Sequence, residues 1–157
     1  MQRVTNCILI NQDYVLLIKK PSRGWYAMPG GKMEQGETIK ESVVREYWEE
    51  TGLTLEKPTL AGVFTFNIYD EQQLENEWMM FTFVNRNYSG TLNDHCKEGE
   101  LTWVRREEVL TLPMAEGDRK IFEYVLSGNK DVLFGAFQYT TAYKLLDFRL
   151  DPWEGVK

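Results

Sequence analysis

The sequence lacks the residues and segments that several protein classes require. It contains one histidine, His95, and two cysteines, Cys7 and Cys96, whose separation fits no metal-binding motif. These counts exclude a histidine-based zinc site, and we expect two free thiols in a reducing compartment. The amino-terminal apolar run is interrupted at residues 11–13, too soon for a signal peptide or a membrane span, so we expect a cytoplasmic protein with no membrane partner.

Positive charge is also scarce. The chain has 18 lysines and arginines against 24 aspartates and glutamates, which gives a net charge of -6. Proteins that bind nucleic acid polymers use lysine and arginine to displace counterions from phosphates, so a polynucleotide partner is not expected. A small anionic substrate is still compatible, because a divalent cation held by carboxylates reverses the local sign of the charge.

The remaining composition is that of a folded domain. Hydrophobic residues make up 43% of the 157 residues and aromatic residues 13%, and no repeat or low-complexity segment interrupts them. A chain of this length is typical of one domain, so we expect a single domain over residues 1–157.

Apolar periodicity and turn residues predict a mixed, partly antiparallel sheet with helices on its faces, which is an α/β fold. Thr38 and Glu41 match a capping box at the start of a helix, and Gly52 stands where that helix is expected to end. Residues 21–31, PSRGWYAMPGG, have the proline and glycine content of a loop. The expected strands are 3–10, 14–19, 59–68, 77–85, 100–104, 132–139 and 143–150, and the expected helices are 38–51 and 116–126.

Three carboxylates lie close together on the first predicted helix. At about 100° per residue, Glu49 and Glu50 fall within about 60° of Glu46, on either side of it. Clustered like charges destabilise a helix unless a cation neutralises them, and Mg²⁺ suits oxygen ligands of this kind. A solvated acidic face, with Arg45 paired to Glu49, is an equally valid interpretation of the helix alone. The apolar arc expected to pack on the sheet contains Ile39, Val43, Val44, Tyr47 and Trp48.

A longer pattern surrounds these carboxylates. From Gly31 the sequence reads GKMEQGETIKESVVREYWEETGL. This string resembles the signature of the Nudix hydrolases: glycine, five residues, Glu, seven residues, Arg-Glu, an aliphatic residue, any residue, Glu-Glu, any residue, glycine and an aliphatic residue. The single departure is Tyr47, at an aliphatic packing position. The residues in register are Gly31, Glu37, Arg45, Glu46, Glu49, Glu50, Gly52 and Leu53.

The resemblance implies a Nudix-type α/β/α sandwich and a metal-dependent hydrolase. Glu46, Glu49 and Glu50 would bind Mg²⁺, for which Mn²⁺ can substitute, together with the backbone carbonyl of Gly30. Arg45 would orient a glutamate through a charge-assisted hydrogen bond. The residues given a structural role in the loop-helix-loop are Gly31, Glu37 and Gly52.

The resemblance also implies ligands from outside the signature. Family members tend to recruit a carboxylate from a distant loop, for which Glu98 is the first candidate and Glu100 the second. Both residues are equally consistent with an ordinary exposed loop. The candidates for holding the substrate phosphates are Lys19, Arg23, Gly31 and Lys32, of which the charged residues are also consistent with solvated surface.

Beyond the signature, the chain resembles the MutT-like branch, the 8-oxo-dGTP diphosphatases. The segments VLLIKKP, WYAMPGGK, LPMAEGDRKIF and FGAFQY carry this resemblance. It implies that Asp118 reads the purine edge, although an aspartate at a helix N-terminus is also favoured by the helix dipole alone. Ala27 stands where some relatives carry a base-reading asparagine. The aromatic residues that either stack on a purine or belong to the core are Trp25, Tyr26, Phe66, Trp78 and Phe81.

The predicted reaction is attack of a metal-activated water on the β phosphorus of a nucleoside triphosphate, which releases the monophosphate and pyrophosphate. Glu46, Glu49 and Glu98 are alternative candidates for the general base. The competing interpretations are a Nudix hydrolase of ADP-ribose, dinucleoside polyphosphates or RNA 5′ triphosphate ends, and a nucleotide-sensing domain without turnover. A monomer and a homodimer are both compatible with the sequence.

Overall fold

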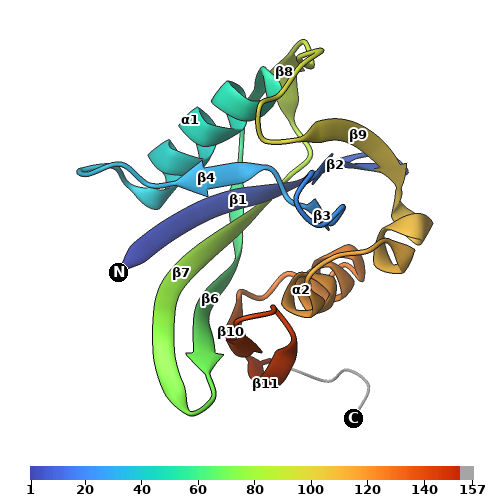
Figure 1. Ribbon diagram of the computed structural model, residues 1–157. Helices are drawn as coiled ribbons and strands as arrows, with labels where there is room; N and C mark the ends of the chain where they lie inside the picture. Colours follow the sequence, from blue (N-terminus) through green and yellow to red (C-terminus); the bar gives the residue numbers. More distant parts are fainter. Residues whose placement is uncertain (153–157) are drawn as a thin grey trace.

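Two helices lie on opposite faces of a nine-stranded mixed sheet in the computed structural model (Figure 1). The structure describes residues 1–152, so the last five residues of the expected domain lie outside the described residues. The strand order is β11-β10-β6-β7-β1-β2-β3, with β4 paired to β1 and β9 paired to β2. The strands are β1 (Gln2–Asn11), β2 (Tyr14–Lys19), β3 (Tyr26–Ala27), β4 (Gly30–Lys32), β6 (Thr59–Asp70), β7 (Gln73–Asn85), β9 (Glu100–Arg105), β10 (Leu133–Thr140) and β11 (Leu145–Asp151).

The sheet combines both kinds of pairing, as expected. β1 runs parallel to β7, and β10 runs parallel to β6, whereas the hairpins β1-β2, β6-β7 and β10-β11 are antiparallel. The helices are α1 (Ile39–Thr51) and α2 (Glu116–Leu126), and no helix within residues 1–152 is long and apolar enough to cross a membrane. The expected mixed sheet with helices on both faces is therefore confirmed.

Several short elements escape the sequence pattern. The segment expected to be a loop contains β3, which pairs with β2, and the start of β4, which pairs with β1. The glycines of β4 allow a close approach to β1, because a side chain at Gly30 would collide with the carbonyl of Thr5. Three further elements were also not expected. They are β5 (Leu53–Leu55) and β8 (Tyr88–Gly90), which form a separate two-stranded sheet, and the 3₁₀ helix η1 (Arg106–Thr111).

The strand alternation of β1 divides the buried side chains into two clusters. Ile8 and Ile10 face the cluster that contains Ile121 of α2, while Cys7 and Leu9 face the cluster that contains Val43 of α1. Successive side chains of a strand point to opposite faces of a sheet. The central strand therefore fixes one helix to each face, and α1 is held against the edge of the sheet where β4 lies (Figure 1).

Helix α1 begins and ends where the sequence predicts. The Thr38 hydroxyl accepts from the backbone N–H of Glu41 at 3.0 Å, and the Thr38 N–H donates to the Glu41 carboxylate at 2.9 Å. Gly52 has a φ of 83° and closes the helix by donating to the carbonyl of Trp48. The expected burial of Trp48 was wrong: this side chain is 57% exposed, because it lies at the far edge of the apolar arc.

Tyr47 generates a test of the packing of α1. Its ring is fully buried, and its hydroxyl has no hydrogen-bond partner within the described residues. Tyr47→Phe keeps the ring and removes a buried unsatisfied group, so the free energy of unfolding should rise by about 1 kcal/mol. Urea denaturation measures this change, with the partly exposed Tyr69→Phe as a control that should stay within about 0.5 kcal/mol. A less stable Tyr47→Phe would show that the hydroxyl is bonded in solution.

Candidate active site

Arg45 connects helix α1 to the loop that precedes it. Its guanidinium donates two hydrogen bonds to Glu37, from Nε to Oε2 at 2.6 Å and from Nη2 to Oε1 at 2.9 Å. Glu37 also accepts from the backbone N–H of Glu34 at 2.7 Å. The bond from Arg45, followed by that N–H, lowers the pKa of Glu37 to about 2. The pair is therefore ionised throughout the neutral range.

The same guanidinium reaches two of the carboxylates predicted to bind metal. Nη1 donates to Glu46 Oε1 at 2.9 Å and to Glu49 Oε2 at 3.1 Å, while Nη2 donates to the carbonyl of Lys32 at 3.1 Å. Charge-assisted bonds of this kind are short and directional. Arg45 thus fixes one oxygen of each carboxylate and ties α1 to β4.

The glycines of β4 allow the strand to lie against these carboxylates. A side chain on Gly31 would collide with the carboxylate of Glu46, and one on Gly30 would collide with β1. Only glycine can occupy either position without displacing a neighbour. β4 consequently brings its backbone within contact of the acidic edge of α1.

Glu50 differs from its two neighbours because it is buried. Its side chain is 7% exposed, and Oε1 has no partner within the described residues. Burial raises the pKa of Glu50 to about 7, against the attraction of Lys20 and with added repulsion from Glu98 and Glu46. A buried carboxylate oxygen without a donor is costly unless a cation or a donor from a ligand reaches it.

The predicted carboxylates line one cavity of about 490 Å³. Glu98 lies in its wall, whereas Glu100 belongs to β9, where it pairs with Lys19 of β2 and does not line the cavity. The loop residues His95, Cys96 and Lys97 also line this cavity and were missed, because nothing in their spacing relates them to α1. The wall residues are Glu46, Glu49, Glu50, His95, Cys96, Lys97 and Glu98.

These groups suit a hard cation without forming a finished metal site. Within residues 1–152, no three His, Cys, Asp or Glu side chains are grouped closely enough to hold a metal ion as they stand. Arg45 draws Glu46 and Glu49 to itself, and Glu50 faces the buried side. Four of the seven wall residues nevertheless carry carboxylates, whose oxygens Mg²⁺ prefers, and Oε1 of Glu50 has no competing partner among the described residues.

Lys19, Arg23 and Lys32, predicted to hold phosphates, do not line the cavity. The guanidinium of Arg23 lies over the rings of Trp25 and Tyr143, 5.2 and 4.7 Å from their centroids. The amine of Lys19 lies 5.8 Å from the centroid of Tyr26, and Lys32 contributes its carbonyl to Arg45. Cation–π contacts of this kind hold Arg23 and Lys19 beside the strand that precedes the glycines.

Asp118 lies in the first turn of α2, beside Tyr139 of β10. It is partly buried, and desolvation raises the pKa of its carboxyl to about 7. The hydroxyl of Tyr139 accepts from the N–H of Gly117 at 2.7 Å, and the Asp118 charge helps to raise the pKa of Tyr139. The dipole of α2 alone would lower the pKa of Asp118, because it favours the ionised carboxylate. The pKa is raised instead, so desolvation outweighs the helix dipole at this position.

The aromatic residues considered for base stacking belong mainly to the core. Phe66 is 3% exposed and stacks between Trp78 and Phe137, with centroid distances of 5.2 and 5.1 Å. Phe81 packs against the cluster under α1. Tyr26 and Trp78 are partly buried and pack against the cluster under α2. The remaining candidate, Trp25, is partly exposed, and the guanidinium of Arg23 lies over its ring.

Comparison with known proteins agrees with this geometry. The NUDIX domain family model matches residues 1–125. The uncharacterized Nudix hydrolase YvcI of Bacillus subtilis is 49% identical over 97% of this chain and 96% of its own length. Nucleoside triphosphatase NudI of Enterobacter sp. (strain 638) is 33% identical over 77% of this chain and 94% of its own length. The crystal structure of a mutator MutT protein from Bacillus halodurans, 51% identical, covers 98% of this chain and 99% of its own with a TM-score of 0.94.

The family match includes every residue that lines the carboxylate cavity. The chain therefore belongs to the Nudix hydrolases, enzymes that act on the diphosphate linkages of nucleotides and generally use divalent metal ions.

Proposed function

We propose that this chain is a Mg²⁺-dependent nucleoside triphosphate pyrophosphohydrolase that converts oxidised purine nucleotides such as 8-oxo-dGTP to the monophosphate and pyrophosphate. The observation that carries the proposal is the single cavity lined by Glu46, Glu49, Glu50 and Glu98. Four carboxylates around one cavity repel a triphosphate unless cations intervene. We place the activity in the cytoplasm, in a monomer or a homodimer.

The metal would be held by the cavity carboxylates and the carbonyl of Gly30, and when bound it neutralises phosphoryl oxygens and supplies an acidified water. Glu50 fits this role through its unpartnered Oε1, and Glu46 through its position against Gly31. Glu49, whose side chain is 51% exposed, has the access to solvent that a general base for a water molecule needs. Glu98 approaches the same cavity from the loop before β9.

Arg45 would act by holding oxygens in place. Its bonds to Glu46 and Glu49 occupy one oxygen of each carboxylate and leave the second oxygen of each for ligands. Glu37 balances the charge of Arg45 and keeps it directed along the helix. Both are positioning roles, because neither residue lines the cavity.

A free nucleoside triphosphate agrees best with the charge of the chain and with its relatives. NudI, matched over most of its length, is named a nucleoside triphosphatase. The net charge of -6 disfavours RNA ends relative to free nucleotides. Lys19, Arg23 and Lys32 are proposed to contact the phosphates from the strands beside the glycines, where aromatic rings hold two of them.

Asp118 supports recognition of an oxidised purine. With a pKa of about 7, its carboxyl is present in both forms at neutral pH and either donates or accepts a hydrogen bond. Guanine presents an acceptor at N7, whereas 8-oxoguanine presents an N–H there. An ionised carboxylate accepts from that N–H and repels the acceptor of normal guanine, which gives a physical basis for discrimination.

A nucleotide panel tests the substrate. With Mg²⁺ present, 8-oxo-dGTP should give the highest kcat/KM and release pyrophosphate, while dGTP, ADP-ribose and a dinucleoside polyphosphate should be poorer substrates. Chelation of divalent ions should abolish turnover. Faster hydrolysis of ADP-ribose or of the dinucleoside polyphosphate would replace the proposed substrate, and metal-dependent nucleotide binding without hydrolysis would favour a sensing domain.

Glu49→Gln tests the carboxylate cavity. The amide keeps the size of the side chain and loses the negative charge, so kcat/KM should fall at least a hundredfold, or about 2.7 kcal/mol in transition-state stabilisation. The matched control is Glu75→Gln, which makes the same change at an exposed position of β7. Full activity of a folded Glu49→Gln protein would remove Glu49 from the mechanism.

Asp118→Asn tests the reading of the purine. The wild-type ratio of kcat/KM for 8-oxo-dGTP over dGTP should rise between pH 6 and pH 8, because the carboxylate forms as the pH passes about 7. The amide does not titrate, so the variant should show a ratio about tenfold lower at pH 8 that is independent of pH, a loss of about 1.4 kcal/mol. The exposed Asp70→Asn variant is the control. An unchanged ratio in Asp118→Asn would assign base recognition elsewhere.

A further inference from the structure

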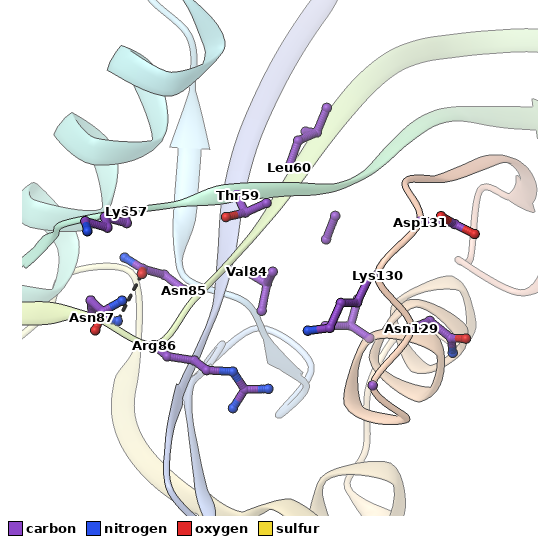
Figure 2. Close-up of a pocket in the computed structure, with 13 residues that line it drawn as sticks. Lys57, Thr59, Leu60, Val84, Asn85, Arg86, Asn87, Asn129, Lys130 and Asp131 are labelled. Carbon is purple, nitrogen blue, oxygen red and sulfur yellow. Dashed lines mark hydrogen bonds between the residues drawn. The ribbon is translucent and has the colours of Figure 1, made fainter.

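A second pocket, of about 250 Å³, lies away from the carboxylate cavity and shares no lining residue with it. It is formed where β6 begins and β7 ends, and the segment that follows α2 closes the other side (Figure 2). Small-molecule sites start at roughly 300 Å³, so only a compact ligand fits. The lining residues are Lys57, Thr59, Leu60, Ala61, Val84, Asn85, Arg86, Asn87, Val125, Gly128, Asn129, Lys130 and Asp131.

The pocket is basic although the chain is acidic. Its walls carry three cations, Lys57, Arg86 and Lys130, and one carboxylate, Asp131. None of the three cations forms an ion pair with any side chain in the part of the chain that the structure describes. Arg86 and Lys130 come from opposite walls, and both extend into the space between β7 and the segment after α2 (Figure 2). Their charges are therefore available to an anion.

A buried hydrogen-bond donor also lines this pocket without a partner. Asn85 is 3% exposed, and its Oδ1 accepts from the N–H of Asn87 at 3.0 Å, which fixes the turn at the end of β7. Its Nδ2 then has no acceptor among the described residues. Figure 2 shows this amide turned toward the part of the pocket where Lys57 lies. A buried donor left unpaired is unfavourable, so an acceptor from a ligand would complete it.

The remainder of the pocket is apolar. Leu60 and Ala61 of β6 and Val84 of β7 meet Val125 of α2 there. Ala61 and Val125 belong to the core cluster under α2, which makes this surface part of the rigid body of the fold. A bare inorganic anion would use the cations but would leave this apolar surface uncovered.

We propose that this pocket is a binding site for a small organic phosphate monoester. Its phosphate would accept hydrogen bonds from Arg86 and Lys130, and its compact apolar body would cover Val84 and Val125. The dianionic head matches three cations opposed by one carboxylate. This pocket shares no lining residue with the carboxylate cavity, so the proposal of a phosphate site can be tested separately from the proposed substrate.

Phenyl phosphate is a suitable probe because it joins a dianionic head to one small ring. It is titrated into the full chain with a chelator present, and amide and methyl NMR spectra report binding. Saturable shifts should appear at the Asn85 side-chain amide and at the methyl groups of Val84 and Val125. Inorganic phosphate should bind more weakly, and phenol should produce no saturable shift. Absence of saturable shifts at these groups, or equal binding of phenol, would overturn the proposal.

Charge variants distinguish specific binding in this pocket from nonspecific attraction of an anion to positive side chains. Arg86→Gln and Lys130→Gln should each weaken phenyl phosphate binding about tenfold. Lys40→Gln makes the same charge change at an exposed position of α1 and should leave binding unchanged. Equal weakening in all three variants would show a nonspecific charge effect and reject the site. Nucleotide hydrolysis should be unaffected by Arg86→Gln, and a parallel loss of hydrolysis would reject the independence of the two sites.

Discussion

The geometry of the candidate active site depends on the ion pair between Arg45 and Glu37. Arg45 lies among the carboxylates of Glu37, Glu46 and Glu49, so their mutual repulsion becomes an attraction to one shared cation. Glu37 carries the two-pronged bond, which is the strongest arrangement available to a guanidinium. Because the guanidinium also bonds the carbonyl of Lys32, the strand of glycines, the loop and the helix are held as one unit.

Glycine makes that unit possible, since the carboxylate of Glu46 occupies the space where a side chain at Gly31 would lie. At Gly52 the requirement is different: its positive φ turns the chain out of α1, and a side chain there would meet Asn93. Gly31 allows β4 to approach the carboxylate of Glu46 closely. Gly52 adopts the left-handed backbone conformation that other residues rarely adopt. Together they set the position of α1 along the sheet edge.

Local rules account for what could be predicted from the sequence. The capping box of Thr38 and Glu41, the end of α1 at Gly52 and the shared edge of Glu46 and Glu49 all follow from spacing within one helix. The exposure of Trp48, the burial of Glu50 and the pairing of β4 with β1 depend on which segments meet across the fold, and spacing carries no such information. The contribution of the segment around β9 to the cavity wall was predictable only as a choice between Glu98 and Glu100. The fold decides between them, because Glu100 pairs with Lys19 in the sheet and Glu98 lines the cavity.

Three buried side-chain atoms have no partner among residues 1–152: the Tyr47 hydroxyl, Glu50 Oε1 and Asn85 Nδ2. Each is unfavourable in an empty protein. The Tyr47 hydroxyl lines neither of the two pockets, so it is a cost of placing a tyrosine where an aliphatic residue would pack. The other two atoms belong to residues in pocket walls, one acidic and one basic, and each has the polarity that a ligand of opposite charge would satisfy. The acidic wall would be completed by a cation, and the basic wall by an anion. Both requirements have the same physical cause, because in each wall a polar atom without a partner is buried beside a cavity.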